Sequence, residues 1–361
     1  MLYNLLAPLA DDYAIFNLMR YLTFRTGGAI MTAMIICFVI GPAMIEKLRA
    51  VQSGSLTKRE YLPDNHLAKV GTPTMGGLMI LISVTISTLL WADLGNLYVW
   101  YTVLVMVGYG IIGFLDDYLK LTKKNSKGLP GRYKVLGQLV FGIIATVGIM
   151  YNLPDEISQK VALPFLKDFF INLSWFFVPW AVVVMIGASN AVNLTDGLDG
   201  LAIVPVAIAA ACFGLISYLV GHAIYSEYLH ITYVPGSGEL AILCGALVGA
   251  SMGFLWFNAP PAMVFMGDTG SLAMGGVLGA IAVVTKHEIV LGIVGGLFVL
   301  ETVSVIVQVA SFKLTGKRVF AMAPLHHHFE KKGWSEPTIV IRFWIIAVIL
   351  ALVGLSTLKL R

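Results

Sequence analysis

Ten long apolar runs follow one another along the chain, and they decide what kind of fold it can adopt. Each run reaches, or closely approaches, the roughly 20 residues that an α-helix needs to cross a bilayer. The runs cover residues 27–45, 70–92, 94–115, 135–154, 169–189, 201–226, 240–258, 268–285, 289–312 and 338–358. Because the chain is 58% hydrophobic and only 12% charged, a soluble globular protein is excluded. The sequence predicts an all-α, polytopic integral membrane protein in which residues 1–361 form a single domain of ten transmembrane helices.

The basic residues predict how these helices are oriented. Lys and Arg are concentrated in the loops that follow the first, third and ninth runs. The loops on the opposite side carry only Lys160, Lys167 and Lys286. Since short basic loops stay in the cytoplasm, both termini are predicted to lie outside it. The net charge of +4 follows from this loop bias, and we expect no nucleic-acid partner.

Two further loops on the predicted cytoplasmic side are acidic and amide-rich. They carry Asn190, Asn193, Asp196, Asp199, Asn258 and Asp268, and the pair Asp116 and Asp117 ends the third run at the same face. Neighbouring carboxylates repel one another unless a cation or a proton relieves them. Five carboxylates beside basic loops therefore favour an active site for Mg²⁺ and a phosphorylated substrate at the cytoplasmic face. Capping of a helix N-terminus is the structural alternative for Asp268.

Several other residues allow both a functional and a structural interpretation. Lys69 has the reach to bind a phosphate but also fits a lysine at the membrane interface, and both interpretations stay open. Lys124 belongs to a basic loop of the kind that sets topology and binds anionic lipid headgroups. Gly108, Gly110 and Gly113 match a dinucleotide-binding pattern. No strand is predicted before them, so close helix packing explains these glycines better.

Glu301 and the histidines His326–His328 stand out near the end of the chain. An ionisable residue inside an apolar run is costly, and we expect a structural role for Glu301. Gly295 and Gly296 would break the helix and bring Glu301 to a polar partner. The consecutive histidines do not have the spacing of a zinc site. Their imidazoles are instead expected to bind diphosphate oxygens or to stack on a uracil or a sugar.

Five motifs together resemble one bacterial enzyme family. They are Gly71-Thr72-Pro73-Thr74-Met75-Gly76-Gly77, Leu115-Asp116-Asp117-Tyr118, the segment from Asn190 to Gly200, Gly267-Asp268-Thr269-Gly270-Ser271, and the segment from Pro324 to Glu330. The chain is similar to the phospho-N-acetylmuramoyl-pentapeptide transferases of the polyprenyl-phosphate N-acetylhexosamine-1-phosphate transferase superfamily. The likeness runs from Lys69 to Arg342 without a departure at these motifs.

The resemblance implies the reaction, the cofactor and the location. Such an enzyme transfers phospho-N-acetylmuramoyl-pentapeptide from its uridine diphosphate carrier to undecaprenyl phosphate, which forms lipid I and UMP in the first membrane step of peptidoglycan synthesis. It requires Mg²⁺ and works in the bacterial inner membrane, so the termini would be periplasmic. The partners are the nucleotide substrate, the lipid phosphate and membrane lipid. The oligomeric state stays open, a homodimer included.

The resemblance also implies roles for individual residues, carried over by motif. Asp268 would be the magnesium ligand, and Asp116 and Asp117 would act as base or nucleophile, with further metal contacts as an option. The implied substrate-binding residues are Lys69, Lys124, Asn190, Asn193, Asp196, Gly197, Leu198, Asp199, Asn258, His326, His327 and His328.

Two alternative functions are kept beside this one. A related enzyme would transfer N-acetylglucosamine phosphate to the same lipid, but the triple histidine followed by Phe329 and Glu330 argues against it. An ion-coupled transporter would use Glu301 and the aspartates for coupling. The gathering of the carboxylates at one face, and the lack of a sequence repeat between the two halves, weigh against a transporter.

Overall fold

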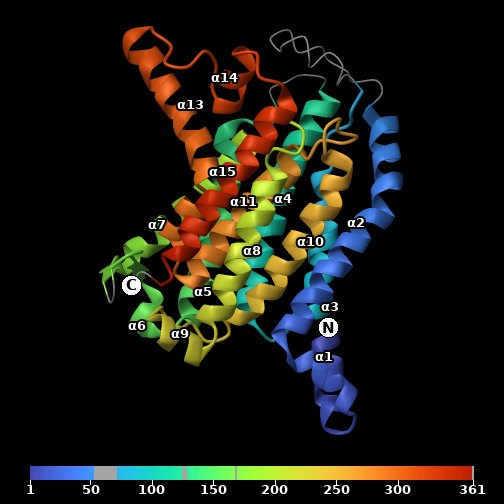
Figure 1. The fold of residues 1–361 in the computed structure, drawn as a ribbon, viewed down its shortest axis with the longest axis vertical. Helices are drawn as coiled ribbons and strands as arrows, with labels where there is room; N and C mark the ends of the chain where they lie inside the picture. Colours follow the sequence, from blue (N-terminus) through green and yellow to red (C-terminus); the bar gives the residue numbers. More distant parts are fainter. Residues whose placement is uncertain (53–70, 124–127, 167–168, 360–361) are drawn as a thin grey trace.

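Long apolar helices make up most of the chain in the computed structural model, which describes residues 1–52, 71–123, 128–166 and 169–359 (Figure 1). The first half of the chain forms α1 (Leu2–Leu6), the 3₁₀ helices η1 (Ala7–Asp11) and η2 (Ala14–Arg20), α2 (Leu22–Gln52), α3 (Gly77–Trp91), α4 (Leu97–Thr122), α5 (Gly131–Asn152), α6 (Asp155–Ser158), β1 (Lys160–Ala162) and β2 (Phe170–Asn172). The two short strands form an antiparallel hairpin, with Val161 opposite Ile171.

The second half is almost entirely helical. It forms η4 (Ser174–Phe176), α7 (Phe177–Thr195), α8 (Ile203–Val220), α9 (Ala223–Leu229), η5 (Ser237–Glu239), α10 (Leu240–Asn258), α11 (Gly267–Thr285), α12 (Glu288–Val294), α13 (Gly296–Thr315), α14 (Leu325–Lys331) and α15 (Glu336–Ser356). Among the described residues, nine helices are long and apolar enough to cross a membrane. The predicted all-α, multi-pass membrane fold is therefore confirmed, apart from the small hairpin.

Four of the predicted runs differ from the helices that they form. The run 169–189 begins with β2 and η4, so its helix α7 starts only at Phe177 and continues to Thr195. The run 70–92 yields only the 15-residue helix α3, because the residues before Gly77 instead pair with the loop that precedes α11. The run 201–226 ends as a helix at Val220, and α9 follows as a separate short helix. The run 289–312 is divided at Gly295, which ends α12 and precedes α13. The predicted break before Glu301 is thus confirmed.

Helix α11 lies at the centre of the bundle, and every residue from 269 to 285 is buried. The neighbouring helices pack most closely against α11 at glycines, which have no side chain. A Cβ atom at Gly113 of α4 would lie 2.2 Å from the carbonyl oxygen of Asp268, and one at Gly275 would lie 2.4 Å from the carbonyl oxygen of Ala188 in α7. Both positions require glycine because the backbones touch there. The packing interpretation of Gly113 is confirmed, and the contact brings the end of α4 beside the start of α11.

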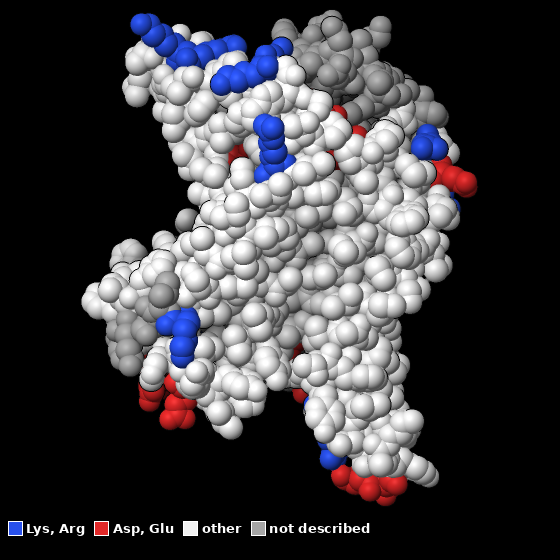
Figure 2. Space-filling view, in the orientation of Figure 1, with Lys and Arg blue, Asp and Glu red and all other residues white. Residues whose placement is uncertain are grey.

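The two ends of the bundle carry opposite charge. The N-terminus and the C-terminal end of α15 lie toward the lower end in Figure 1, together with α6 and α9. Lys and Arg gather over the end of α13 and over α14 at the upper end, whereas Asp and Glu gather over the N-terminal helices and α6 at the lower end (Figure 2). The exposed residues behind this contrast include Lys313, Lys317, Arg318, Lys331 and Lys332 above, and Asp11, Asp12, Asp155 and Glu156 below.

Candidate active site

Three carboxylates converge at the basic end of the bundle. Asp116 and Asp117 lie near the end of α4, and Asp268 lies in the first turn of α11. One carboxylate oxygen from each of the three lies within 4.8 Å of the others. Asp116 and Asp117 are buried, and the Asp268 side chain is 15% exposed. The structure therefore brings together the three residues that were predicted to hold a metal.

Two lysines lie among these carboxylates. Lys134, at the start of α5, places its Nζ 2.6 Å from Asp268 Oδ2 and 3.0 Å from Asp116 Oδ1. Lys120, one turn after Asp116 in α4, places its Nζ 2.5 Å from Asp116 Oδ2 and 3.4 Å from Asp268 Oδ2. Two ammonium groups against three carboxylates leave one negative charge, so the cluster favours one further cation.

Asp117 binds the N-terminus of α11 from the neighbouring helix. Its Oδ2 accepts hydrogen bonds from the backbone N–H of Thr269, at 3.0 Å, and from the Thr269 hydroxyl, at 2.8 Å. A helix N-terminus has unpaired N–H groups and partial positive charge, both of which stabilise a carboxylate. The capping role that was considered for Asp268 thus belongs to Asp117, and the Asp268 side chain faces Lys134 instead.

Asp196 lies just after the end of α7 and near the same cluster. Burial, the largest cause, and the negative charges of Asp268 and Asp117 together raise the pKa of Asp196 to about 8, against a smaller lowering by a hydrogen bond from the Gly267 backbone. A carboxyl group with this pKa holds its proton at neutral pH. Asp196 can therefore donate a hydrogen bond to a phosphate or a sugar without adding negative charge to the site.

Amide side chains from α5 and α7 form a chain of hydrogen bonds next to the carboxylate cluster. Asn193 Nδ2 donates to Asp268 Oδ1 at 3.0 Å and to the Ser271 hydroxyl at 2.7 Å. One turn earlier, Asn190 Nδ2 donates to Gln138 Oε1 at 3.1 Å. Gln138 is fully buried and donates in turn to Ser189. These bonds hold both predicted asparagines in fixed positions, with Asn193 in contact with Asp268.

The segment after α7 is tied to the loop that precedes α11. Asp199 Oδ2 accepts the backbone N–H of Ala262 at 3.0 Å, and the Asp199 N–H donates to Glu336 at 2.9 Å. Asn258 Oδ1 accepts the N–H of Gly200, which has a φ of 72° that favours glycine. Leu198 is buried in a second apolar cluster beside α15, so its side chain packs against protein, whereas Gly197 is exposed.

The three histidines have three different environments on α14. His326 is 1% exposed and contacts Glu301 of α13, with 3.3 Å between Nδ1 and Oε2. His327 Nδ1 pairs with Glu330 Oε2 at 2.5 Å on the same helix. His328 Nδ1 accepts the backbone N–H of Ala321 at 3.1 Å. Only His326 points toward the segment that follows α7, as shown by the short distance between its Nε2 and the Cβ position of Gly197.

Lys69 and Lys124 lie outside the described residues. The motif that follows Lys69 is described, and it runs beside the start of α11. Gly76 and Gly77 donate their backbone N–H groups to Phe265 and Met266, at 2.8 and 2.9 Å. The first and fourth motifs of the sequence therefore meet at the acidic cluster.

Sequence reasoning missed Lys120 and Lys134 as site residues and assigned both to topology alone. Lys120 carried a usable signal, because it follows Asp116 by four residues on one helix and so shares its face. Lys134 had none, since a loop separates it from α4. Thr269, Ser271, Gln138 and Glu336 also contact predicted site residues.

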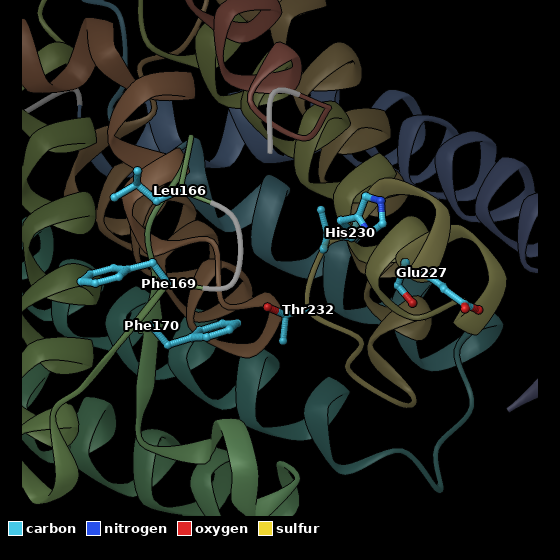
Figure 3. A pocket seen from close by; sticks show the side chains of 8 residues that line it. Leu166, Phe169, Phe170, Glu227, His230 and Thr232 are labelled. Atoms are coloured by element: carbon cyan, nitrogen blue, oxygen red, sulfur yellow. The ribbon is translucent and has the colours of Figure 1, made fainter.

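A separate hollow of about 190 Å³ lies at the opposite end of the bundle. Figure 3 shows Phe169 and Phe170 of the hairpin on one side of it, and Glu227, His230 and Thr232 on the other. No residue that was predicted for the active site lines this hollow. This hollow is therefore separate from the carboxylate cluster.

Comparisons with known proteins give one matching family model and several curated relatives. The family model for glycosyl transferase family 4 matches residues 99–286, which include the acidic cluster. Three curated relatives named phospho-N-acetylmuramoyl-pentapeptide-transferase align with the whole chain over their whole length. They come from Granulibacter bethesdensis, 62% identical over 362 residues, Maricaulis maris, 61% identical over 367 residues, and Rhodopseudomonas palustris, 60% identical over 362 residues.

Proposed function

The chain belongs to the phospho-N-acetylmuramoyl-pentapeptide-transferase family, and we propose that it uses Asp116, Asp117 and Asp268 to form lipid I at the cytoplasmic face of the bacterial inner membrane. The substrates are UDP-N-acetylmuramoyl-pentapeptide and undecaprenyl phosphate, and the second product is UMP. The whole chain acts as one catalytic domain. The observation that carries the site assignment is the cluster of three carboxylates and two lysines at the start of α11.

The reaction is a phosphoryl transfer between two anions. An oxygen of the lipid phosphate forms a bond to the sugar-side phosphorus of the nucleotide, and the bond from that phosphorus to the UMP oxygen breaks, so that UMP leaves with the electron pair. A lipid phosphate that carries a proton gives it to Asp116 or Asp117. Lys120 and Lys134 stabilise the charge that develops on the phosphate oxygens, because both lie next to these carboxylates.

The donor set fits Mg²⁺, which prefers carboxylate oxygens and phosphate. Asp268 would hold the ion from the first turn of α11, with Asp116 or Asp117 as additional ligands. When bound, the ion would neutralise diphosphate oxygens as a Lewis acid. The excess of one carboxylate over the two lysines supports this assignment, as does the oxygen-only set of ligands.

The segment from Asp196 to Asp199 is assigned to the nucleotide side of the site, with Asn190, Asn193 and Asn258 as its support. Asp196 can donate a hydrogen bond, and the exposed Gly197 leaves the backbone open to a ligand. His326 completes this side of the site, with His327 and His328 beside it on α14. Lys69 and Lys124, in segments outside the described residues, are assigned to substrate binding by their motifs alone.

A two-substrate assay of UMP release tests the proposed function. We expect UMP only when the pentapeptide nucleotide, undecaprenyl phosphate and Mg²⁺ are all present. UDP-N-acetylglucosamine in place of the pentapeptide nucleotide tests the related enzyme activity and is expected to release no UMP. Release of UMP from UDP-N-acetylglucosamine but not from the pentapeptide nucleotide would contradict the proposal. Flux of an ion or a sugar into vesicles without UMP release would also contradict it.

The orientation can be tested separately with reporters. We infer ten crossings, with α3 as the tenth, because an even number returns both termini to one face. A reporter within residues 319–332 is expected to read cytoplasmic, since the loops at this end are basic. A reporter within residues 156–162, at the acidic end, is expected to read periplasmic. The opposite pair of readings would put the carboxylates on the wrong side of the membrane for a cytoplasmic nucleotide.

A further inference from the structure

Glu301 is a fully buried acid in the first half of α13 and is used by no step of the proposed reaction. A carboxylate at this depth is costly unless polar groups stabilise it. Both of its oxygens face α14. Oε1 accepts the backbone N–H of His326 at 3.2 Å, and Oε2 lies 3.3 Å from Nδ1 of the same residue. Glu301 therefore contacts one histidine through its backbone and its ring.

The other side of the His326 ring faces the nucleotide side of the site. A Cβ atom at Gly197 would lie 2.2 Å from His326 Nε2, so this nitrogen rests against the Gly197 backbone. His326 is 1% exposed, and neither ring nitrogen has a partner in hydrogen-bond geometry among the described residues, although Nδ1 lies 3.3 Å from Glu301 Oε2. A buried polar nitrogen without a partner is unfavourable, and its position beside Gly197 suits a hydrogen bond to a bound substrate.

We propose that Glu301 is a positioning residue that fixes the tautomer of His326 for nucleotide binding. The carboxylate lies 3.3 Å from Nδ1, so its negative charge favours the tautomer with the proton on Nδ1, and the group that faces one ring nitrogen determines which nitrogen is protonated. Nε2 is then an acceptor, and it receives a hydrogen bond from an O–H or N–H group of the nucleotide substrate. This inference rests on the proposed function, since it assigns a specific contact to the same nucleotide.

The second Glu–His pair differs in a way that supports this assignment. His327 and Glu330 lie on the same short helix and are partly exposed, so their contact is local. Glu301 instead connects α13 to α14 and acts on the ring that reaches Gly197. The hydrogen bond from the His326 backbone N–H places Glu301 beside the first turn of α14.

The first test is a kinetic comparison of Glu301→Gln with the parent enzyme. The Gln amide nearly preserves the volume but removes the charge that holds the Nδ1 proton. We expect the KM for the pentapeptide nucleotide to rise about tenfold, the loss that one hydrogen bond involving a charged group produces. The KM for undecaprenyl phosphate should not change, and Glu301→Asp should recover part of the nucleotide affinity. A fall in kcat alone, with an unchanged nucleotide KM, would overturn the proposal.

Two controls separate positioning from general damage. Glu288→Gln removes another buried acid, at the opposite end of the bundle, and should leave the nucleotide KM unchanged. In a double-mutant cycle, Glu301→Gln should add no further rise in nucleotide KM once His326→Gln is present, because Glu301 acts through that ring. Additive effects would show that Glu301 acts by another route.

A spectroscopic measurement decides the case even when Glu301→Gln does not fold. The ¹⁵N spectrum of the ¹⁵N-histidine-labelled parent, with the His326 signals identified by their loss in His326→Gln, reports which nitrogen is protonated. We expect a protonated Nδ1 and a bare Nε2 near neutral pH. A bare Nδ1 would overturn the proposal. If the parent enzyme released no UMP, the proposed function would be contradicted. The tautomer measured for His326 would not depend on that outcome.

Discussion

Replacing Asp268 with asparagine is expected to lower turnover by about a thousandfold while the protein still folds. The Asp268 oxygens serve two purposes: Oδ1 accepts from Asn193, and Oδ2 faces Lys134 and Lys120. Asparagine keeps the volume and one acceptor but removes the charge. The cluster would then contain two carboxylates and two ammonium groups, with no excess negative charge to attract a divalent cation.

The measurement is UMP release per folded protein across a Mg²⁺ titration, together with the thermal stability of each variant. Asp155→Asn is a matched control, because Asp155 is an exposed carboxylate at the opposite end of the bundle. Its turnover should equal that of the parent. Near-normal turnover of Asp268→Asn at low Mg²⁺ would exclude Asp268 as a required ligand.

Lys134→Met is expected to reduce turnover about a hundredfold, the usual loss when one preorganised charge-stabilising donor is removed. Methionine preserves most of the apolar stem of the lysine, so packing at the start of α5 should survive. The ammonium group is 2.6 Å from Asp268 and 3.0 Å from Asp116, and its loss leaves two buried or nearly buried carboxylates facing one another with Lys120 alone. Both the charge balance and the phosphate contact would be lost.

The same assay tests this variant, with Lys160→Met in the hairpin at the opposite end of the bundle as the control for removing a lysine. Turnover of Lys134→Met above about one-third of the parent value would contradict a role in charge stabilisation, since even a weak contact to a charged group is worth more. A stronger dependence on Mg²⁺ in Lys134→Met would agree with that role, because the ion would have to neutralise more of the diphosphate charge.

The membrane fold and the three carboxylates could be predicted from the sequence, for a physical reason. A run of about 20 apolar residues has few alternatives to a membrane helix, because the backbone must pair internally in lipid. The ends of such helices then fall at one face or the other. Asp116, Asp117 and Asp268 could thus be assigned to the same membrane face without knowledge of the packing, and the structure confirms that they meet.

The features that depend on contacts between distant segments could not be predicted. Apolar composition does not distinguish one continuous helix from two, so the separation of α8 from α9 was missed. The shortness of α3 follows from backbone pairing with residues 265 and 266, which no local pattern reveals. The capping of α11 by Asp117 likewise depends on how closely α4 approaches, and Gly113 permits that approach only once the two helices are paired.

The backbone contacts around α11 also determine which parts of the protein are able to move during a catalytic cycle. Gly77, Gly113 and Gly275 place α3, α4 and α7 directly against α11, or against its first turn, with no intervening side chain. Sliding or rotating any of these helices would force backbone atoms together, because packed interiors yield little. The carboxylates on α4 and α11 are therefore held in fixed positions relative to one another. We expect the conformational changes that accompany substrate entry and release in α13 and α14, which have few buried residues, and not beside the reacting atoms.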